Sequence, residues 1–306
     1  MQKINIYTEN YFVSSQFKYW IKKILGKNSR GPLAVMRSLV SGLDELNVSY
    51  SINSKIHSRI HTACILSNHK TLAWALKQKK LGHIKKIIAG PNIAITPNDF
   101  GKMLQHPDID IIIVPSQWVK DFYTSVAPQI ASKIRIWAAG VALSENIGTL
   151  KDTDFLVYAK TCPDALIKHI TDDLGREKYS YQLIKYGKFS QQEYFNLLSR
   201  SKYLIYLTES ESQGIAMFEA WVRNVPTLVW DRGFWAKDQY KFEGNTASPY
   251  LNNELGMRFK NVSDFKNVLE TFVQESFSPD KYVKNNFTFK ISAEKYLNIV
   301  SSLENE

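Results

Sequence analysis

The chain has 306 residues, and its hydrophobic fraction of 44% excludes a mainly disordered protein and allows two packed domains. Lys and Arg number 39 against 29 Asp and Glu, so the formal net charge of +10 favours an anionic partner. The sequence contains no arginine-rich arm, zinc-finger spacing or aromatic nucleic-acid motif, which argues against nucleic acid as that partner.

The sequence also indicates a cellular location. No run of eighteen apolar residues occurs, and the first residues lack the basic region and apolar core of a signal peptide. The two cysteines, Cys64 and Cys162, lie far apart in or beside apolar runs, as is typical of reduced core thiols. We therefore expect a cytoplasmic protein.

Short β-branched runs alternate with helix-period segments along the chain, which predicts parallel sheets covered by helices. The N-terminal half is expected to form strands at 3–7, 49–52, 63–67, 86–89, 109–115 and 134–137, and helices at 32–46, 71–81 and 118–126. After a polar stretch at 143–154, strands follow at 155–159, 182–186, 203–207 and 227–230, with helices at 164–174, 191–199, 214–222 and 263–275. An amphipathic segment at 292–303 ends the chain. The pattern predicts an α/β protein of two doubly wound Rossmann-like domains facing a central cleft, where open parallel sheets bind ligands.

Two local patterns refine this prediction. Ser190 and Glu193 form a capping box, which fixes the start of the helix at 191–199. The segment 17–27 places Phe17, Trp20, Ile21 and Ile24 on one helical stripe with lysines opposite. That composition suits a helix in an anionic membrane interface, and it suits slightly better a helix that packs its apolar face on its own domain.

The segment 208–221 carries the clearest chemical signal. It follows a predicted strand, crosses a polar loop and begins a helix at Gly214. The unpaired backbone N–H groups in the first turn of that helix can bind a diphosphate. Glu211 lies in the loop and Glu219 about one and a half turns into the helix, so both carboxylates can face one ligand. In the alternative interpretation, Glu211 caps the helix and Glu219 pairs with Arg223.

Seven residues separate Glu211 from Glu219, with Gly214 between them and Pro226 soon after. This pattern resembles the signature of retaining GT-B glycosyltransferases, the family-four group. The resemblance covers most of the chain in order and spacing. It includes the glycine loop at Gly31-Pro32, the strand and helix around 109–118, the strand to the hinge at 133–141, and the glycine-containing turn at Tyr186-Gly187.

The resemblance implies an acceptor-side domain at 1–145, a donor-binding domain at 146–285 and a C-terminal helix at 286–306 that packs on the N-terminal domain. It implies sugar transfer, with retention, from a nucleoside-diphosphate sugar to a saccharide or lipid-linked acceptor in surface glycan synthesis, with no cofactor and no metal. The catalytic candidates are Glu211 and Lys160. The donor-binding candidates are Glu219, Gly214, Ile215, Ala216, Gly31, Tyr186 and Gly187.

His69 and Asn92 follow predicted strands and are weaker candidates for contact with donor or acceptor. Ordinary loop roles explain them equally well. A possible further partner is an anionic membrane surface, which would place the protein peripherally on the inner face of the membrane.

Two positions depart from the family pattern. After the first strand of the C-terminal domain the family has two basic residues; here Lys160 fills the first position, Ala165 stands at the second, and Lys168 lies too far along. The diphosphate clamp is therefore weakened or rebuilt from another loop. Ala142 replaces an acidic residue after the hinge, which we interpret as a change in hinge packing.

Other functions remain open. A nucleotide-sugar epimerase would need further acid and base residues, and a catalytically weak nucleotide-sugar-binding partner subunit would fit the missing basic residue. Two Asp-x-Asp pairs, Asp108 with Asp110 and Asp152 with Asp154, mimic a metal motif of another glycosyltransferase fold. Such short pairs are common by chance, so we do not interpret them as metal sites.

Overall fold

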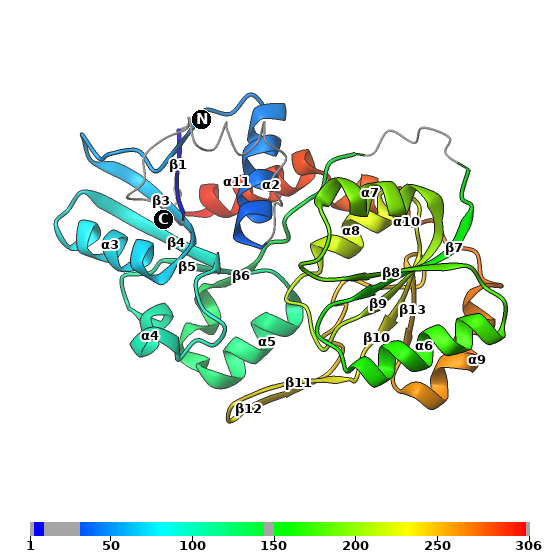
Figure 1. The fold of residues 1–306 in the computed structure, drawn as a ribbon. Coiled ribbons are helices and arrows are strands. Elements are labelled where there is room, and N and C mark those ends of the chain that lie inside the picture. The colour runs from blue at the N-terminus through cyan, green and yellow to red at the C-terminus, as the bar shows by residue number, and fades with distance from the viewer. Residues whose placement is uncertain (1–2, 9–30, 144–149, 304–306) are drawn as a thin grey trace. The chain divides into compact units, whose positions relative to one another are not determined.

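The computed structural model describes residues 3–8, 31–143 and 150–303. Its contacts divide the chain into two compact units (Figure 1). Unit 1 comprises Met1–Gly140 and Phe289–Glu306, and unit 2 comprises Val141–Thr288. The segment 17–27, with its predicted interfacial helix, lies outside the described residues. None of the helices in the described part of the chain is both long and apolar enough to span a bilayer.

Unit 1 is built on a six-stranded parallel sheet. Its strand order is β2 (Tyr50–Ile52), β1 (Ile4–Tyr7), β3 (Ile60–Ser67), β4 (Ile84–Asn92), β5 (Ile111–Val114) and β6 (Ile134–Ile136). β3 and β4 begin earlier than the apolar runs predict, because Ile60 pairs with Ile84 and extends the ladder through polar residues. Cys64 is buried in β3, where burial raises the pKa of its thiol to about 12.

The helices of unit 1 are α2 (Pro32–Glu45), α3 (His69–Lys80), α4 (Asp99–Lys102), α5 (Gln117–Val126) and α11 (Phe289–Ser302), with 3-10 turns at Met103–Gln105 and Pro128–Lys133. The C-terminal helix α11 lies against α2. A Cβ at Gly42 would clash with the Phe289 carbonyl and the Ala293 side chain, so glycine permits this close approach. Ser292 Oγ donates to Ala138 O (2.7 Å) and Trp137 Nε1 donates to Ser292 O (2.8 Å), which ties α11 to the end of β6.

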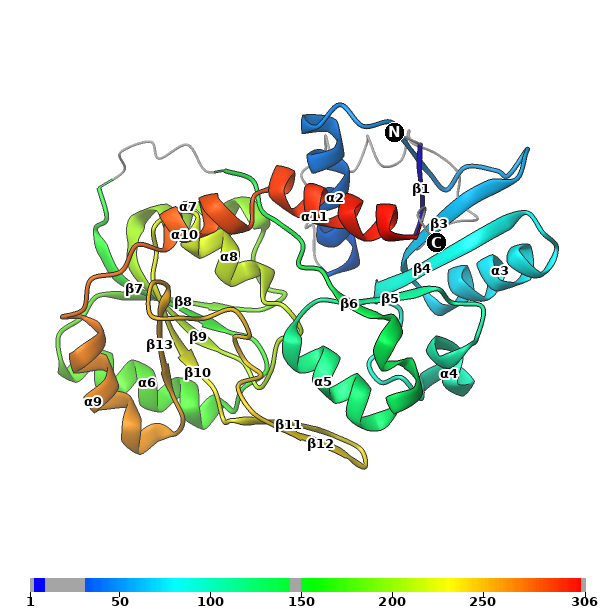
Figure 2. The ribbon, with the colours of Figure 1, turned by 180° about the vertical axis from the view of Figure 1, so that it is seen from behind.

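Unit 2 contains a five-stranded parallel sheet. Its strand order is β13 (Gly256–Phe259), β10 (Thr227–Trp230), β9 (Ser201–Leu207), β7 (Thr153–Ala159) and β8 (Tyr181–Lys185). One face is covered by α6 (Asp164–Arg176) and α9 (Val262–Phe272), the other by α7 (Gln191–Arg200), α8 (Ile215–Trp221) and α10 (Pro279–Asn286) (Figures 1 and 2). A hairpin of β11 (Phe234–Lys237) and β12 (Tyr240–Glu243) projects from the end of β10.

Two local predictions for unit 2 are confirmed. Ser190 Oγ accepts a hydrogen bond from Glu193 N (3.1 Å) and Glu193 Oε2 accepts one from Ser190 N (3.3 Å), so the capping box begins α7. Cys162 is a free, half-buried thiol whose pKa burial raises to about 11. Both cysteines are therefore reduced thiols.

Candidate functional site

The pairing of β7 with β9 brings together two catalytic candidates that are distant in sequence. Ala159 at the end of β7 pairs with Leu207 at the end of β9, and Lys160 N donates to Leu207 O (2.9 Å). The residues that follow both strands therefore emerge side by side at the carboxyl edge of the sheet. From there the loop after β9 carries Glu211 toward Lys160.

The Glu211 carboxylate is the centre of this cluster. Its Oε1 accepts hydrogen bonds from Lys160 Nζ (2.7 Å) and from the Tyr206 hydroxyl (2.6 Å). The backbone N–H of Glu211 donates to Thr246 O (2.8 Å), which fixes the loop itself. The Glu211 side chain is 11% exposed, so these bonds act in a partly dry environment and are stronger than in water.

The helix after the Glu211 loop begins at a glycine. Gly214 is the N-cap residue of α8 and has no side chain with which to cap it. Gly214 has φ of 87°, a left-handed conformation that glycine adopts without strain. Ile215 and Ala216 begin the helix, and Tyr194 holds it by donating from its hydroxyl to Ala216 O (2.8 Å).

Aromatic rings line the buried side of the cluster. The rings of Tyr206 and Tyr158 stack at 4.8 Å, and Tyr158 also contacts Phe189 and Tyr194. Burial raises the pKa of Tyr206 well above its usual range, and the neighbouring Glu211 carboxylate raises it further. Tyr206 is therefore a protonated donor at physiological pH. Sequence reasoning assigned it no role, because a strand tyrosine is usually a packing residue.

Tyr186 and Gly187 lie on the more exposed side. Tyr186 N donates to Ala159 O (2.8 Å) at the end of β7, and Lys160 Nζ lies 5.1 Å from the centre of the exposed Tyr186 ring. Gly187 has φ of 89°, which lets the chain turn directly after β8. Of the predicted residues, Lys160 thus contacts both the Glu211 carboxylate and the Tyr186 ring, and Gly187 follows Tyr186 in the chain.

Glu219 lies further along α8 and has a different set of contacts. Its Oε1 accepts a hydrogen bond from Gln191 Nε2 (2.8 Å), in the first turn of α7. Arg223 Nη1 donates to the backbone carbonyl of Glu219 (2.8 Å), and its guanidinium lies 3.9 Å from the Phe195 ring centre. Burial lowers the pKa of Arg223, and the Glu219 charge opposes that shift.

The other predicted site residues belong to unit 1. Gly31 has φ of 54° and precedes α2, with Pro32 in the predicted first-turn position. His69 begins α3, and its ring stacks on Phe100 at 3.9 Å. Asn92 ends β4, and its buried Nδ2 has no hydrogen-bond partner among the described residues.

A cation that sequence reasoning missed lies beside the Glu211 loop. Arg232 follows β10, and its Nη1 lies 3.3 Å from Glu209 Oε1. Ala165 is exposed in the first turn of α6, and Lys168 is 76% exposed and paired with Asp172 at 2.6 Å. Arg232 could have been suspected from its place just after a strand, at the edge where Lys160 also emerges.

The neighbouring Asp231 braces this region. Its buried carboxylate accepts hydrogen bonds from Gly233 N (3.0 Å), Thr246 N (3.4 Å) and Ala247 N (3.2 Å). Arg258 Nε lies 3.7 Å from Asp231 Oδ2. Because Thr246 O in turn accepts from Glu211 N, Asp231 indirectly supports the position of Glu211.

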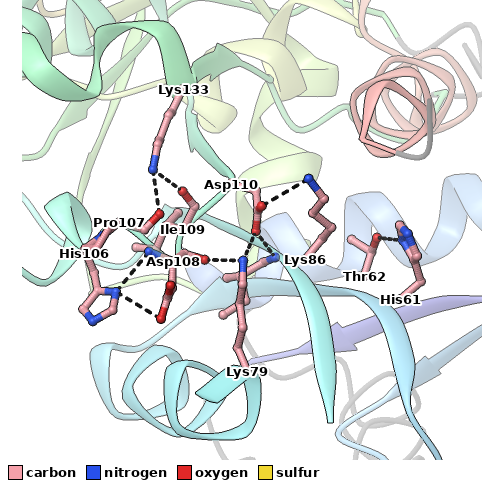
Figure 3. Close-up of polar contacts among 11 residues, drawn as sticks. His61, Thr62, Lys79, Lys86, His106, Pro107, Asp108, Ile109, Asp110 and Lys133 are labelled. Carbon is pink, nitrogen blue, oxygen red and sulfur yellow. Dashed lines mark hydrogen bonds and ion pairs between the residues drawn. The ribbon is translucent and has the colours of Figure 1, made fainter. Parts of the chain in front are cut away.

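The two Asp-x-Asp pairs are engaged with cations of the chain. Asp110 Oδ2 accepts from Lys79 Nζ (2.5 Å), as Figure 3 shows, and also from Ile87 N (2.8 Å). Asp152 pairs with Arg200, whose hydrogen bonds lower the pKa of that carboxyl. Among the described residues, no group of three His, Cys, Asp or Glu side chains could hold a metal ion.

Comparison with known proteins gives matches to solved structures alone. No family model and no curated protein matches the chain. A lipopolysaccharide outer core galactosyltransferase, WaaB in its apo form, is similar over 98% of this chain and 99% of its own, with 13% identity and a TM-score of 0.62. TarM from S. aureus, in complex with fondaparinux, α-GlcNAc-glycerol and UDP, matches 87% of this chain with 13% identity and a TM-score of 0.53.

This chain spans 58% of the TarM chain. UDP-GlcNAc 2-epimerase from Methanocaldococcus jannaschii is similar over 98% of this chain and 100% of its own, with 10% identity and a TM-score of 0.50. At identities this low, the structural similarity establishes the fold alone. The chain therefore has the predicted α/β fold of two Rossmann-like units, as in the GT-B glycosyltransferases WaaB and TarM.

Proposed function

We propose that the protein is a retaining glycosyltransferase that moves a sugar from a nucleoside-diphosphate sugar to a saccharide or lipid-linked acceptor in surface glycan synthesis. The observation that carries the proposal is the position of Glu211 at the carboxyl edge of the unit 2 sheet, bound by Lys160 and Tyr206. A carboxylate next to a partly exposed ammonium suits a reaction in which opposite charges develop on the sugar and on the departing diphosphate. Two similar structures, a galactosyltransferase and a protein in complex with UDP, agree with this chemistry.

In the proposed donor complex, Glu219 accepts hydrogen bonds from the two ribose hydroxyls, and Gln191 orients its carboxylate. Lys160 lies at the diphosphate together with the amides that begin α8. Arg232 adds the second cation that Ala165 does not supply, since it already lies beside the loop. Gly31 is a further proposed donor-binding residue, and the proposal needs no metal because Lys160 and Arg232 balance the phosphate charge.

The proposed reaction breaks the bond between the anomeric carbon and the diphosphate oxygen. The acceptor hydroxyl forms a new bond to that carbon, and its proton leaves with the diphosphate. Glu211 holds hydroxyls of the transferred sugar while positive charge develops on its ring. Lys160 stabilises the negative charge on the leaving phosphate, and both effects are larger in the transition state than in the ground state.

The direct test is transfer by the purified protein. Donors are first selected from a panel of nucleotide sugars by thermal shift, and release of nucleoside diphosphate is then measured with and without acceptors. We expect acceptor-dependent release, and Glu219→Ala should weaken diphosphate binding about tenfold in calorimetry, the scale of one lost hydrogen bond to a charged group. A wild-type protein that transfers nothing would favour the partner subunit, and a donor epimerised without release would favour the epimerase.

A basic part of unit 1 supports the proposed location at an anionic membrane. Between Glu45 and Asp99 the chain has no acidic residue, whereas it carries Lys55, Arg59, Lys70, Lys77, Lys80 and Lys85, together with Lys79 and Lys86, which pair with Asp110. Ile60 N donates to His83 O (3.0 Å), so the loop 53–59 lies beside the turn after α3 (Figure 1). Leu81 in that turn is 57% exposed. Lysine side chains around an exposed leucine suit anionic lipid headgroups. Nucleic acid is the less suitable partner, because arginine, which makes bidentate contacts with phosphate, is scarce here.

Vesicle flotation tests this location. Changing Lys77, Lys80 and Lys85 to Gln should lower affinity for anionic vesicles by roughly 100-fold, since each surface lysine contributes about 1 kcal/mol. The control changes three exposed lysines of unit 2, Lys188, Lys237 and Lys281, and so removes the same net charge. Equal loss in both variants, or equal recovery with neutral vesicles, contradicts a membrane surface at this site.

A further inference from the structure

The two donors to Glu211 differ in mobility. Both Lys160 Nζ and the Tyr206 hydroxyl bind the same oxygen, Oε1. Lys160 reaches it with a long side chain that is 24% exposed. Tyr206 is 1% exposed and lies on a central strand, where its backbone pairs with Tyr158 on one side and Val229 on the other. One donor can therefore turn away, whereas the other is held in place.

The proposed function makes competing demands on Lys160. In the free protein its ammonium satisfies the Glu211 carboxylate. When a nucleoside diphosphate binds, the same ammonium is attracted by the greater negative charge of the phosphates. A shared or lost bond to Lys160 would leave Glu211 free to rotate at the moment when the donor sugar needs a fixed acceptor of hydrogen bonds.

We propose that Tyr206 is a positioning residue that keeps the Glu211 carboxylate oriented after Lys160 turns to the donor phosphates. This inference rests on the proposed function and adds to it a residue that does not touch the substrate. The Tyr206 ring is fixed by its stacking on Tyr158 at 4.8 Å, so its hydroxyl cannot follow Lys160. Because burial and the Glu211 charge raise the pKa of Tyr206, its proton stays available for the bond throughout the working pH range.

Tyr206→Phe tests the role, because it removes the hydroxyl and keeps the ring. We expect kcat to fall about 10- to 100-fold, the scale of one hydrogen bond to a charged group, with KM for the donor and diphosphate affinity within about twofold of wild type. A purely structural defect would lower the melting temperature and the active fraction but leave kcat per folded molecule unchanged. Tyr203→Phe is the matched control on the same strand, where the ring packs on Phe155 and Phe272. It should behave as wild type.

A second measurement needs no turnover. Tyr206→Phe should raise the equilibrium constant for unfolding about tenfold or more in the wild-type background, since a nearly buried carboxylate loses a donor. In a Glu211→Ala background, where that carboxylate is gone, the same change should have at most about a twofold effect. If Tyr206→Phe changes the unfolding equilibrium equally in both backgrounds, Tyr206 and Glu211 are not coupled and the inference is wrong.

The two measurements separate the inference from the proposed function. Wild-type turnover in Tyr206→Phe would show that Tyr206 does not position Glu211 for transfer, although the glycosyltransferase proposal would stand. A wild-type protein without transfer activity would sink that proposal, and the positioning role with it. The unfolding cycle would still decide whether Tyr206 and Glu211 are coupled.

Discussion

Glu211→Gln is expected to lower kcat by two to three orders of magnitude, while diphosphate affinity and folding stay near wild type. The substitution keeps the size of the side chain and its ability to accept a hydrogen bond from Tyr206, and it removes the charge. If Glu211 acts while positive charge develops on the sugar, that charge matters most in the transition state. Turnover, diphosphate affinity and melting temperature are measured on the same preparations.

Glu209→Gln is the comparison for this prediction. It makes the same chemical change two residues earlier, at a half-exposed carboxylate that pairs with Arg232. Its effect on kcat should be less than about tenfold, because exposed ion pairs contribute little. Near-normal turnover in Glu211→Gln, or equal losses in both variants, would remove the catalytic assignment of Glu211.

The alternation of strands and helices was predictable because most buried strands are short, largely apolar runs. Ile111–Val114 is apolar at every position, and Thr227–Trp230 follows the helix stop at Val225-Pro226. The capping box at Ser190 is a signal confined to four residues, so it needed no tertiary context. The meeting of Lys160 with the Glu211 loop also follows from the predicted sheet, since both residues come just after parallel strands.

The missed elements are those whose structure depends on a neighbour. β13 reads Gly-Met-Arg-Phe, which carries no strand signal, and it forms because β10 offers a parallel partner for each residue. The β11–β12 hairpin was missed although its aromatic residues are typical of strands, because each of its two strands has only four residues. α10 is largely polar and begins at Pro279, and its contacts with α8 stabilise it.

The same reason explains what sequence reasoning missed at the site. A hydrogen bond between Tyr206 and Glu211 depends on the side-chain directions of a strand and of the loop that follows it, and periodicity reports only that Tyr206 is buried. Arg232 and Asp231 approach the Glu211 loop through the pairing of β9 with β10 and the return of the chain at Thr246. Such contacts are properties of packing and register, whereas motifs report residues that are close in sequence.

Lys160→Ala is the second substitution with a large expected effect, a fall in kcat of two to three orders of magnitude. The Lys160 ammonium lies 2.7 Å from the Glu211 carboxylate. The position where the family has a second basic residue is Ala165, which carries no charge. Removing the Lys160 ammonium should raise the barrier for departure of the diphosphate. Lys160→Arg keeps the charge on a planar group of different reach, so it should recover part of the activity.

Two further variants make the result specific. Lys168→Ala removes an exposed lysine of α6 that pairs with Asp172, and it should leave transfer unchanged. Arg232→Ala removes the cation beside the Glu211 loop and should cost about tenfold or more if Arg232 replaces the missing second basic residue. The measurement is kcat with saturating donor, together with diphosphate affinity by calorimetry. If Lys160→Ala loses no more activity than Lys168→Ala, then Lys160 is a structural partner of Glu211, and the leaving phosphate is stabilised by Arg232 or by the backbone amides that begin α8.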